Sequence, residues 1–442
     1  MGKDADPQIT AQFGLYEDKS LQDFIDSKGQ EMVKISHRSN IDYHFRVLDS
    51  EILNAFAVPG GYVYFTRGIM AHFNNEAEFA GVLGHEIGHI AARHSVEQQR
   101  NQILGQAGII AGVVLAPELA GLAEPASQGM GLLLLKFGRD AERESDKLGV
   151  EYSSKIGYDA SEMAEFFLTL ERQSSASGKG ELPEFLSTHP NPGNRLVDVG
   201  KQAEEWKKKL RLKDPKVNRA AYLKRIEGLV YGEDPKQGYL EEGVFYHPQL
   251  KFQFAIPSGW RYQNSPSQVQ LAEPEGKALM ILSAAKAGTP KEAAEAFLQQ
   301  NGLQAIDVKE TAVNGLTALI VIADTKPQQG QQQPPLRTVS YFIRYNDLIY
   351  LLMGVATTSD FDGRFGTFTA SQESFRELSD AEKLNKQPER IRIKTVAATN
   401  TLENILKAYK VDEKRLEEIA IVNGMQLKDQ VEKGSLIKVP ER

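Results

Sequence analysis

The chain has 442 residues, a length that corresponds to about three domains at ~150 residues each. Its 52 basic and 59 acidic residues give a net charge of −7, which argues against a protein that binds nucleic acid through positive charge. Cysteine is absent, which excludes disulfides, thiolate metal sites and cysteine nucleophiles, so any metal must be held by His, Asp or Glu. No run of 18 apolar residues occurs, so no membrane-spanning helix is expected.

The first part of the chain mixes helical and strand patterns. The predicted elements are a helix at 19–35, strands at 43–49 and 53–66, and a long helix that runs from an Asn74 or Asn75 cap to about Gln102. The turn signal Pro59-Gly60-Gly61 interrupts the second strand pattern, which therefore predicts a hairpin.

Residues 103–135 are mostly uncharged and rich in apolar residues and glycine. This composition predicts a buried helical hairpin. The alternative is a lid, or a surface that faces a membrane or a partner. The uncharged run at 103–116 is too short to span a bilayer as a helix.

The pattern changes after residue 235. Before it, helices are predicted at about 130–156, 160–173, 193–211 and 216–230. From 244 onward short β-rich runs dominate, interrupted by one helix at 290–301, and the last 50 residues form a small unit of their own. We therefore expect three domains, at 1–235, 236–384 and 385–442.

The sequence His85-Glu86-Ile87-Gly88-His89 lies on the predicted long helix. Helix positions i and i+4 are about 40° apart and about 6 Å along the axis, so the two imidazoles can hold one metal ion. Zinc prefers such nitrogen ligands, and Glu86 lies beside the metal, where a general base is needed. His94, five residues after His89 and about 140° round the helix, is interpreted as a surface or packing residue.

A third ligand is expected on another element, with a fourth position open for water. Glu142, Glu144 and Asp146 on the 130–156 helix all qualify by spacing. Glu142 and Asp146 are four residues apart, so one could bind the metal while the other orients a ligand histidine. A solvated, ion-paired helix face is the alternative interpretation.

The segment Arg139, Glu142, Ser145, Asp146 and Gly149, together with the histidine motif, resembles the HtpX- and BepA-type zinc metallopeptidases, gluzincins related to the CAAX prenyl proteases. The resemblance covers about residues 10–235. It implies a mainly α-helical, zincin-type domain with a small β-sheet. It also implies one zinc ion held by His85, His89 and Glu142, with Asp146 as the companion of a ligand; Ser145 replaces the family's usual alanine.

Two further segments match the same family. The run from Asn54 to Gly61 resembles its strand beside the active-site cleft, which makes Ala57, Gly60 and Gly61 candidates for pairing with an extended substrate; an ordinary hairpin is the alternative. The Ser-Thr-His189-Pro element followed by Arg195 resembles a family motif near the metal. The resemblance makes both residues candidates for a fourth zinc ligand or an oxyanion stabiliser, with loop packing as the alternative for His189.

The other two domains carry weaker likenesses. Residues 240–380 resemble the α+β fold of PsbP and Mog1, carry no catalytic cluster and suggest a scaffold or interaction role. Residues 390–440 resemble a LysM module, which implies a small βααβ unit. LysM modules bind glycans such as peptidoglycan, and docking to an envelope protein is the alternative.

The resemblance implies a zinc-dependent endopeptidase in quality control of misfolded or misassembled bacterial envelope proteins. Proteins or peptides are its expected substrates, nucleic acid is not expected as a partner, and peripheral membrane association is compatible with the sequence. The polar start MGKDADPQIT lacks an apolar signal core, which fits either a cytoplasmic start or a chain from which an export signal has been removed. The resemblance favours the second interpretation, an extracytoplasmic protein whose export signal is not part of this chain. The rival functions are a chaperone or assembly factor with a latent site, and a cell-wall-binding protein in which proteolysis is secondary.

Overall fold

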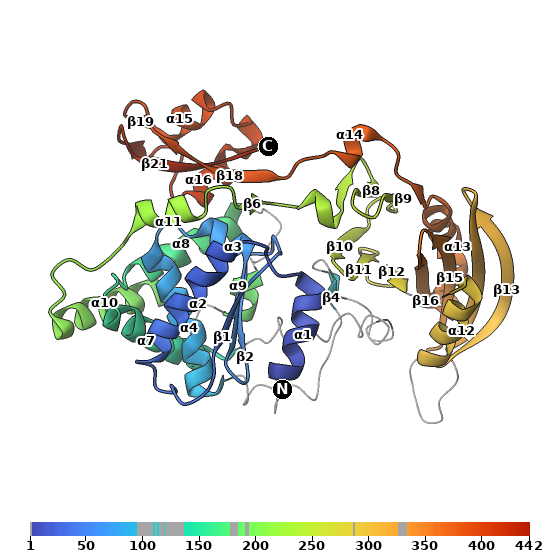
Figure 1. Cartoon of the computed structure of the whole chain (residues 1–442), viewed down its shortest axis with the longest axis horizontal. Coiled ribbons are helices and arrows are strands. Elements are labelled where there is room, and N and C mark those ends of the chain that lie inside the picture. The colour runs from blue at the N-terminus through green and yellow to red at the C-terminus, as the bar shows by residue number, and fades with distance from the viewer. Residues whose placement is uncertain are drawn as a thin grey trace. The chain divides into compact units, whose positions relative to one another are not determined.

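The computed structural model describes residues 2–94, 109–110, 113–114, 119, 137–176, 184–190, 194–285, 288–325 and 334–442 (Figure 1). The chain divides into two compact units, here called unit 1 (1–103, 129–233 and 388–442) and unit 2 (104–128 and 234–387). No helix in the described ranges combines the length and the apolar composition needed to cross a bilayer.

A small sheet lies at the start of unit 1, with the order β1-β3-β2. Its strands are β1 (His44–Leu48), β2 (Ala55–Val58) and β3 (Tyr62–Thr66). β3 runs parallel to β1 and antiparallel to β2. Gly60 and Gly61 form the predicted turn between β2 and β3, with φ angles of 99° and 96° that favour glycine, and a Cβ on Gly61 would collide with the carbonyl oxygen of Asp42.

The long helix α4 (Glu76–Ala92) begins where the sequence predicts, because the Asn75 side chain accepts a hydrogen bond from the Glu78 N–H at 2.8 Å. Every residue from Glu76 to Ile90 is buried. The helix ends at Ala92 and not near Gln102 as predicted, because Arg93 adopts the left-handed conformation (φ 65°) and turns the chain.

Helix α7 (Arg139–Lys155) packs against α4 at unusually close range. A Cβ on Gly84 would lie 2.9 Å from the carbonyl oxygen of Gly149, and a Cβ on Gly149 would lie 2.9 Å from the backbone nitrogen of His85. These glycines let the two backbones touch, which places the first turn of α7 beside the histidine pair of α4.

Further helices complete the first two segments of unit 1. They are α1 (Gly2–Phe13), α2 (Lys19–Val33), α3 (Arg67–His72), α8 (Glu162–Ala176), α9 (Glu184–Thr188), α10 (Arg195–Leu210) and α11 (Arg219–Arg225). The sequence analysis did not predict α1. Apolar side chains of α2, α4, α8 and the small sheet share one hydrophobic core.

The C-terminal segment also belongs to unit 1 by its contacts. Its main elements are β18 (Glu389–Thr395), α15 (Leu402–Ala408), α16 (Leu416–Val422) and β21 (Leu436–Glu441). β18 pairs with β21 on one side and with β6 (Val230–Tyr231) on the other, so the segment shares a sheet with the chain that precedes unit 2. The predicted division into three domains stays a prediction.

Unit 2 is built on a seven-stranded antiparallel sheet with the order β10-β11-β12-β16-β15-β14-β13. The strands are β10 (Arg261–Ser265), β11 (Gln268–Ala272), β12 (Ala278–Ala285), β13 (Leu303–Val313), β14 (Leu316–Thr325), β15 (Leu336–Tyr345) and β16 (Leu348–Thr357). A second sheet, β17-β9-β8-β7, contains β7 (Tyr239–Glu241), β8 (Val244–His247), β9 (Phe252–Ala255) and β17 (Arg376–Glu377).

Two helices cover opposite faces of the large sheet. α12 (Pro290–Gln300) packs in the cluster that contains Phe342, whereas α13 (Thr358–Glu373) packs in the cluster that contains Tyr341. Neighbouring residues of a strand point to opposite faces, so the two helices sandwich β15. The sequence analysis predicted α12 but not α13.

Most of residues 103–135 lies outside the described residues, so the choice between a buried hairpin and a lid stays open. Within it, β4 (Ile109–Ile110) and β5 (Val113–Val114) pair as antiparallel strands. The helical prediction is therefore wrong for these four residues, whose β-branched side chains favour extended backbone.

Candidate metal centre

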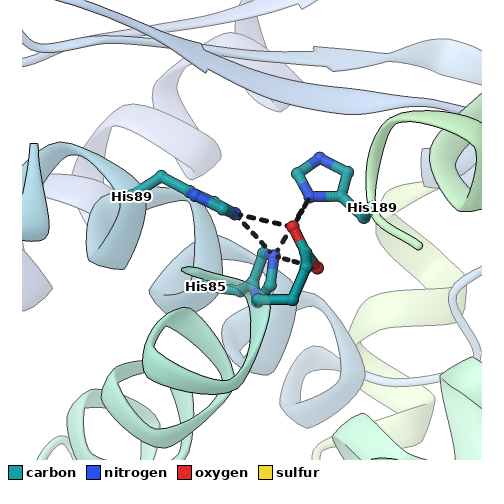
Figure 2. A group of neighbouring side chains, drawn as sticks. His85, His89 and His189 are labelled. Carbon is teal, nitrogen blue, oxygen red and sulfur yellow. Dashed lines mark hydrogen bonds and ion pairs between the residues drawn. The ribbon is translucent and has the colours of Figure 1, made fainter. Parts of the chain in front are cut away.

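His85 and His89 stand one turn apart on α4, and their Nε2 atoms lie 3.0 Å from each other (Figure 2). Both side chains are fully buried. The ring of Phe137 stacks on His89 with centroids 4.0 Å apart, which fixes the plane of that imidazole.

Glu142, in the first turn of α7, is the carboxylate that meets these nitrogens. Its Oε1 lies 3.4 Å from His89 Nε2, and its Oε2 lies 3.6 Å from His85 Nε2. Of the three acids left open by spacing, Glu144 points away, with 60% of its side chain exposed. Asp146 lies on the other side of His85. The close α4–α7 packing thus selects Glu142 for the cluster.

The far side of His85 is held by a buried ion pair. Asp146 Oδ1 lies 2.9 Å from His85 Nδ1 and 2.6 Å from Arg195 Nη2. The same Arg195 nitrogen lies 3.3 Å from Glu142 Oε2, and the guanidinium stacks 3.8 Å above the ring of Phe167. Arg195, at the start of α10, therefore ties together the two carboxylates of α7.

His189 completes the cluster from the end of α9 (Figure 2). Its Nδ1 lies 3.0 Å from Glu142 Oε1 and 3.3 Å from His85 Nε2. The ring stacks on Phe185 with centroids 4.5 Å apart. His85, His89, Glu142 and His189 thus each offer one ligand atom, and these atoms all lie within 4.8 Å of one another.

The donor set fits a metal ion. Tetrahedral zinc with bonds of about 2.0–2.1 Å needs ligand atoms about 3.3 Å apart, close to the separations in this cluster. Both histidines of α4 have their Nδ1 atoms engaged by other groups, so their Nε2 lone pairs converge on the same point. Glu142 Oε2 has no hydrogen-bond partner among the described residues, although it is buried. A cation held by the four ligand atoms of the cluster would satisfy this oxygen.

Glu86 lies beside the cluster. Its carboxylate is fully buried, and neither oxygen accepts a hydrogen bond from the described residues. His189 lies close to it, with Nε2 3.6 Å from Glu86 Oε1. Burial raises the pKa of the Glu86 carboxyl.

The other ionisable groups respond to the same environment. Burial lowers the pKa of His89 well below its usual range, which keeps the ring neutral and able to bind metal. Burial opposes ionisation of Glu142, but the charge and hydrogen bond of His189 outweigh it and hold the pKa of Glu142 well below its usual range. Burial also lowers the pKa of His189, but the carboxylates of Glu142 and Glu86 raise it more.

His94 lies closer to the cluster than helical spacing predicts. It is buried, and its Nδ1 lies 3.1 Å from His89 Nδ1. The expectation of a 140° separation assumed a continuous helix, whereas the left-handed Arg93 folds His94 back toward the site. The sequence pattern does not predict this turn, because an arginine such as Arg93 is not a signal for the end of a helix.

The residues predicted to pair with an extended substrate lie partly on a strand and partly in a turn. Ala57 is on β2, at one end of the strand order of its sheet, whereas Gly60 and Gly61 lie in the turn that follows. Whether this hairpin pairs with an extended substrate stays a prediction.

Residues 19–203 match the family model described as Peptidase family M48. The "Beta-barrel assembly-enhancing protease" of Yersinia pestis is 32% identical over 212 residues, which are 45% of this chain and 42% of that protein. "Metalloendopeptidase OMA1, mitochondrial" of Bos taurus is 30% identical over 165 residues, 36% of this chain and 32% of that protein. The chain thus spans less than half the length of these curated relatives. The matches support a metallopeptidase domain in this region, which contains all members of the buried cluster.

Among solved structures, cyanobacterial PsbP (CyanoP) from Synechocystis sp. PCC 6803 covers 30% of this chain and 91% of its own, with 12% identity and a TM-score of 0.26. A score this low does not establish a shared fold.

Proposed function

We propose that the protein is a zinc-dependent endopeptidase in which His85, His89 and Glu142 hold one zinc ion per chain and Glu86 is the catalytic base. The main support is the convergence of the two imidazole Nε2 atoms and the Glu142 carboxylate. Beside them lies the buried carboxylate of Glu86, which has no hydrogen-bond partner among the described residues. The match to Peptidase family M48 supports the same activity.

A zinc ion in this cluster would polarise the scissile carbonyl and acidify a water molecule. Glu86 would accept the proton of that water as it attacks and then deliver it to the leaving amine. Its raised pKa suits both halves of this transfer, because a carboxylate that is too acidic would not hold the proton. The absence of hydrogen bonds to Glu86 from the described residues leaves its oxygens available to the water.

Asp146 and Arg195 support this chemistry through contacts with the proposed ligands. Asp146 accepts the Nδ1 proton of His85 and thereby presents the Nε2 lone pair to the metal. Arg195 neutralises the buried carboxylates of Glu142 and Asp146. We keep Arg195 as a candidate oxyanion stabiliser, because its charge lies within this cluster.

His189 has two candidate roles. Its Nδ1 is close to Glu142 and His85, as a fourth ligand would be, and in that position it would take the place of the water. The alternative is that the imidazole moves aside and stabilises the oxyanion of the transition state.

For the substrate we propose misfolded or misassembled proteins of a bacterial envelope, with the protein acting outside the cytoplasm. The support is the name of the relatives, "Beta-barrel assembly-enhancing protease", at 30–32% identity. The comparisons do not favour a latent-site chaperone or a cell-wall-binding protein. A LysM-like role of the C-terminal segment, with peptidoglycan or an envelope protein as partner, stays a prediction, as does peripheral membrane association.

The test compares wild type with Glu86→Gln in a casein or peptide cleavage assay, with zinc content measured on the same samples. Glutamine preserves the shape of the side chain but cannot accept the water proton, so hydrolysis should fall by about 10²–10⁴-fold. Zinc should be retained at about one per chain in both proteins. The matched control is Glu165→Gln, which makes the same change at an exposed position on α8.

Two results would contradict the proposal. One is unchanged peptidase activity in Glu86→Gln, which would remove the base from the mechanism. The other is full zinc occupancy after His85→Ala, His89→Ala or Glu142→Ala, which would place the ion elsewhere. The inactive Glu86→Gln protein also serves as a substrate trap, and envelope proteins should be enriched among its cross-linked partners.

A further inference from the structure

Beyond the proposed ligands, a third histidine, His94, follows the end of α4, and its position depends on one backbone turn. α4 ends at Ala92, and Arg93 adopts a left-handed conformation, with φ 65° and ψ 25°. Residues with a Cβ, apart from asparagine and aspartate, rarely adopt this conformation, because the Cβ crowds the following carbonyl. The consequence here is that His94 folds back over the last turn of α4, with its ring centroid 5.2 Å from that of His89.

His94 is bonded at both ring nitrogens. Its Nδ1 lies 3.1 Å from His89 Nδ1 and 3.2 Å from Ser145 Oγ, and its Nε2 lies 3.3 Å from Glu144 Oε2. The imidazole is buried, whereas Glu144 is largely exposed. A chain of contacts therefore runs from the metal cluster through two imidazoles to a surface carboxylate.

Metal binding fixes the protons along this chain. If His89 offers its Nε2 lone pair to the metal, its neutral ring carries the remaining proton on Nδ1. That Nδ1–H then donates to His94, which must accept at its own Nδ1 and carry its proton on Nε2. The Nε2–H of His94 in turn donates to the Glu144 carboxylate.

We propose that His94 is a positioning residue for the metal centre, which accepts the Nδ1 proton of His89 and links it to Glu144. This inference rests on the proposed metal site. The two ligand histidines are then supported differently: Asp146 contacts His85 Nδ1 directly at 2.9 Å, whereas His89 reaches its carboxylate through a second imidazole. Groups that orient ligand histidines in this way typically contribute about 10–100-fold to metal affinity.

The test uses two amides that imitate different nitrogens of histidine. In His94→Asn the amide oxygen lies where Nδ1 was, so an acceptor for His89 remains. In His94→Gln the amide reaches the Nε2 position, so the contact to Glu144 can remain while the one to His89 is lost. Zinc affinity is measured by competition with a chromophoric chelator, and the apo proteins are compared by thermal unfolding.

We expect His94→Gln to weaken zinc binding by about 10–100-fold and His94→Asn to recover most of that loss. His37→Asn is the matched control, because this histidine lies mostly exposed beside Tyr152 and outside the cluster, and should leave the affinity unchanged. Wild-type zinc affinity in His94→Gln would overturn the inference, and so would equal losses in both amides. A wild-type protein that binds no zinc would instead overturn the proposed function.

A variant of Ser145 completes the experiment, because the Ser145 hydroxyl also contacts Nδ1 of His94. Ser145→Ala removes that neighbour and leaves the contact between the histidines, so zinc affinity should not fall. A loss as large as that of His94→Gln would make Ser145 the important partner and overturn the role assigned to His89.

Discussion

The carboxylate of Asp146 lies 2.9 Å from His85 Nδ1, on the side of the imidazole away from Glu142. Both groups are buried, and Arg195 pairs with the same Asp146 oxygen at 2.6 Å. A negative charge in this position favours the tautomer of His85 that presents its Nε2 lone pair to the cluster. The orientation of His85, a proposed metal ligand, is therefore set by Asp146, which is not itself a proposed ligand.

Asp146→Ala should weaken zinc binding by about 10–100-fold, because His85 loses the group that fixes its tautomer. It should also lower the unfolding temperature, since Arg195 remains as a buried cation with Glu142 as its remaining ion-pair partner. Chelator competition and thermal unfolding measure the two effects. Asp140→Ala removes an exposed carboxylate from the same helix and should change neither quantity; equal effects of the two substitutions would contradict the assigned role.

The C-terminal segment contributes a buried lysine to the core of unit 1. Lys438 Nζ donates to the carbonyl oxygens of Ala71 at 2.9 Å and Phe73 at 3.0 Å, at the end of α3 and just before α4. Burial lowers the pKa of Lys438 well below its usual range and raises the pKa of nearby Glu78 to about 8. Residues 388–442 are thus built into the unit that carries the metal cluster.

Lys438→Met keeps an unbranched apolar side chain, one heavy atom shorter, but leaves both carbonyl oxygens without this donor. A buried polar group that loses its partner costs about 1–3 kcal/mol, so the loss for two carbonyl oxygens should destabilise the protein by roughly 2–6 kcal/mol. Denaturant unfolding gives this free energy. Lys433→Met changes an exposed lysine of the same segment and should be nearly neutral. Similar stabilities of the two variants would show that the buried contacts contribute little.

The start of α4 and its pair of candidate metal ligands follow from local sequence, whereas the end of the helix does not. Asn75 is a good cap and His85 and His89 have helical spacing, so short-range rules suffice for both. Arg93 ends the helix through a backbone conformation that arginine does not signal. The position of His94 depends on that turn, so the expected separation of 140° from His89 does not hold, whereas its interpretation as a packing residue agrees with its burial outside the four-residue cluster.

The choice among the acids of α7 depends on tertiary structure. Spacing leaves Glu142, Glu144 and Asp146 open, because all three lie within five residues of one helix. The close contact of Gly84 with Gly149 brings Glu142 and Asp146 to opposite sides of His85 and leaves Glu144 outside. Helix α13 escaped prediction because its apolar residues are mixed with Gly363 and Gly366, which weaken a helical pattern.

The buried position of His72 predicts that the free energy of unfolding depends on pH. It is buried at the end of α3, with Nδ1 2.8 Å from the carbonyl oxygen of Gly68, and burial lowers its pKa from 6.5 to about 4. The unfolded chain therefore binds a proton at a higher pH than the folded protein does. The stability that neutral His72 provides is complete above pH 6.5 and is lost as the pH falls from 6.5 toward 4.

As the pH falls from 7.5 to 5, the low pKa of His72 in the folded protein should lower the free energy of unfolding by about 2 kcal/mol. Denaturant unfolding of the metal-free protein at both pH values measures it. His72→Gln removes the titrating group, so the loss of stability over this range should be smaller by that amount. An equal loss in both proteins would show that other groups set the acid sensitivity.

His189 is the residue whose removal distinguishes two mechanisms. Its Nδ1 lies 3.0 Å from Glu142 and 3.3 Å from His85 Nε2, and stacking on Phe185 holds the ring there. With a metal bound in this arrangement, the imidazole would occupy the position that the proposed attacking water needs. We therefore expect a resting state with bound zinc and weak basal activity.

His189→Ala should then retain zinc through His85, His89 and Glu142, and should cleave a test peptide faster than wild type does. The control is His37→Ala, which removes a histidine outside the cluster and should leave the rate unchanged. If His189 instead stabilises the oxyanion, its removal should lower the rate at unchanged zinc content by about 10²–10³-fold. Parallel measurements of zinc content and initial rate decide between the two, because a clear fall in rate with zinc retained excludes the inhibitory role.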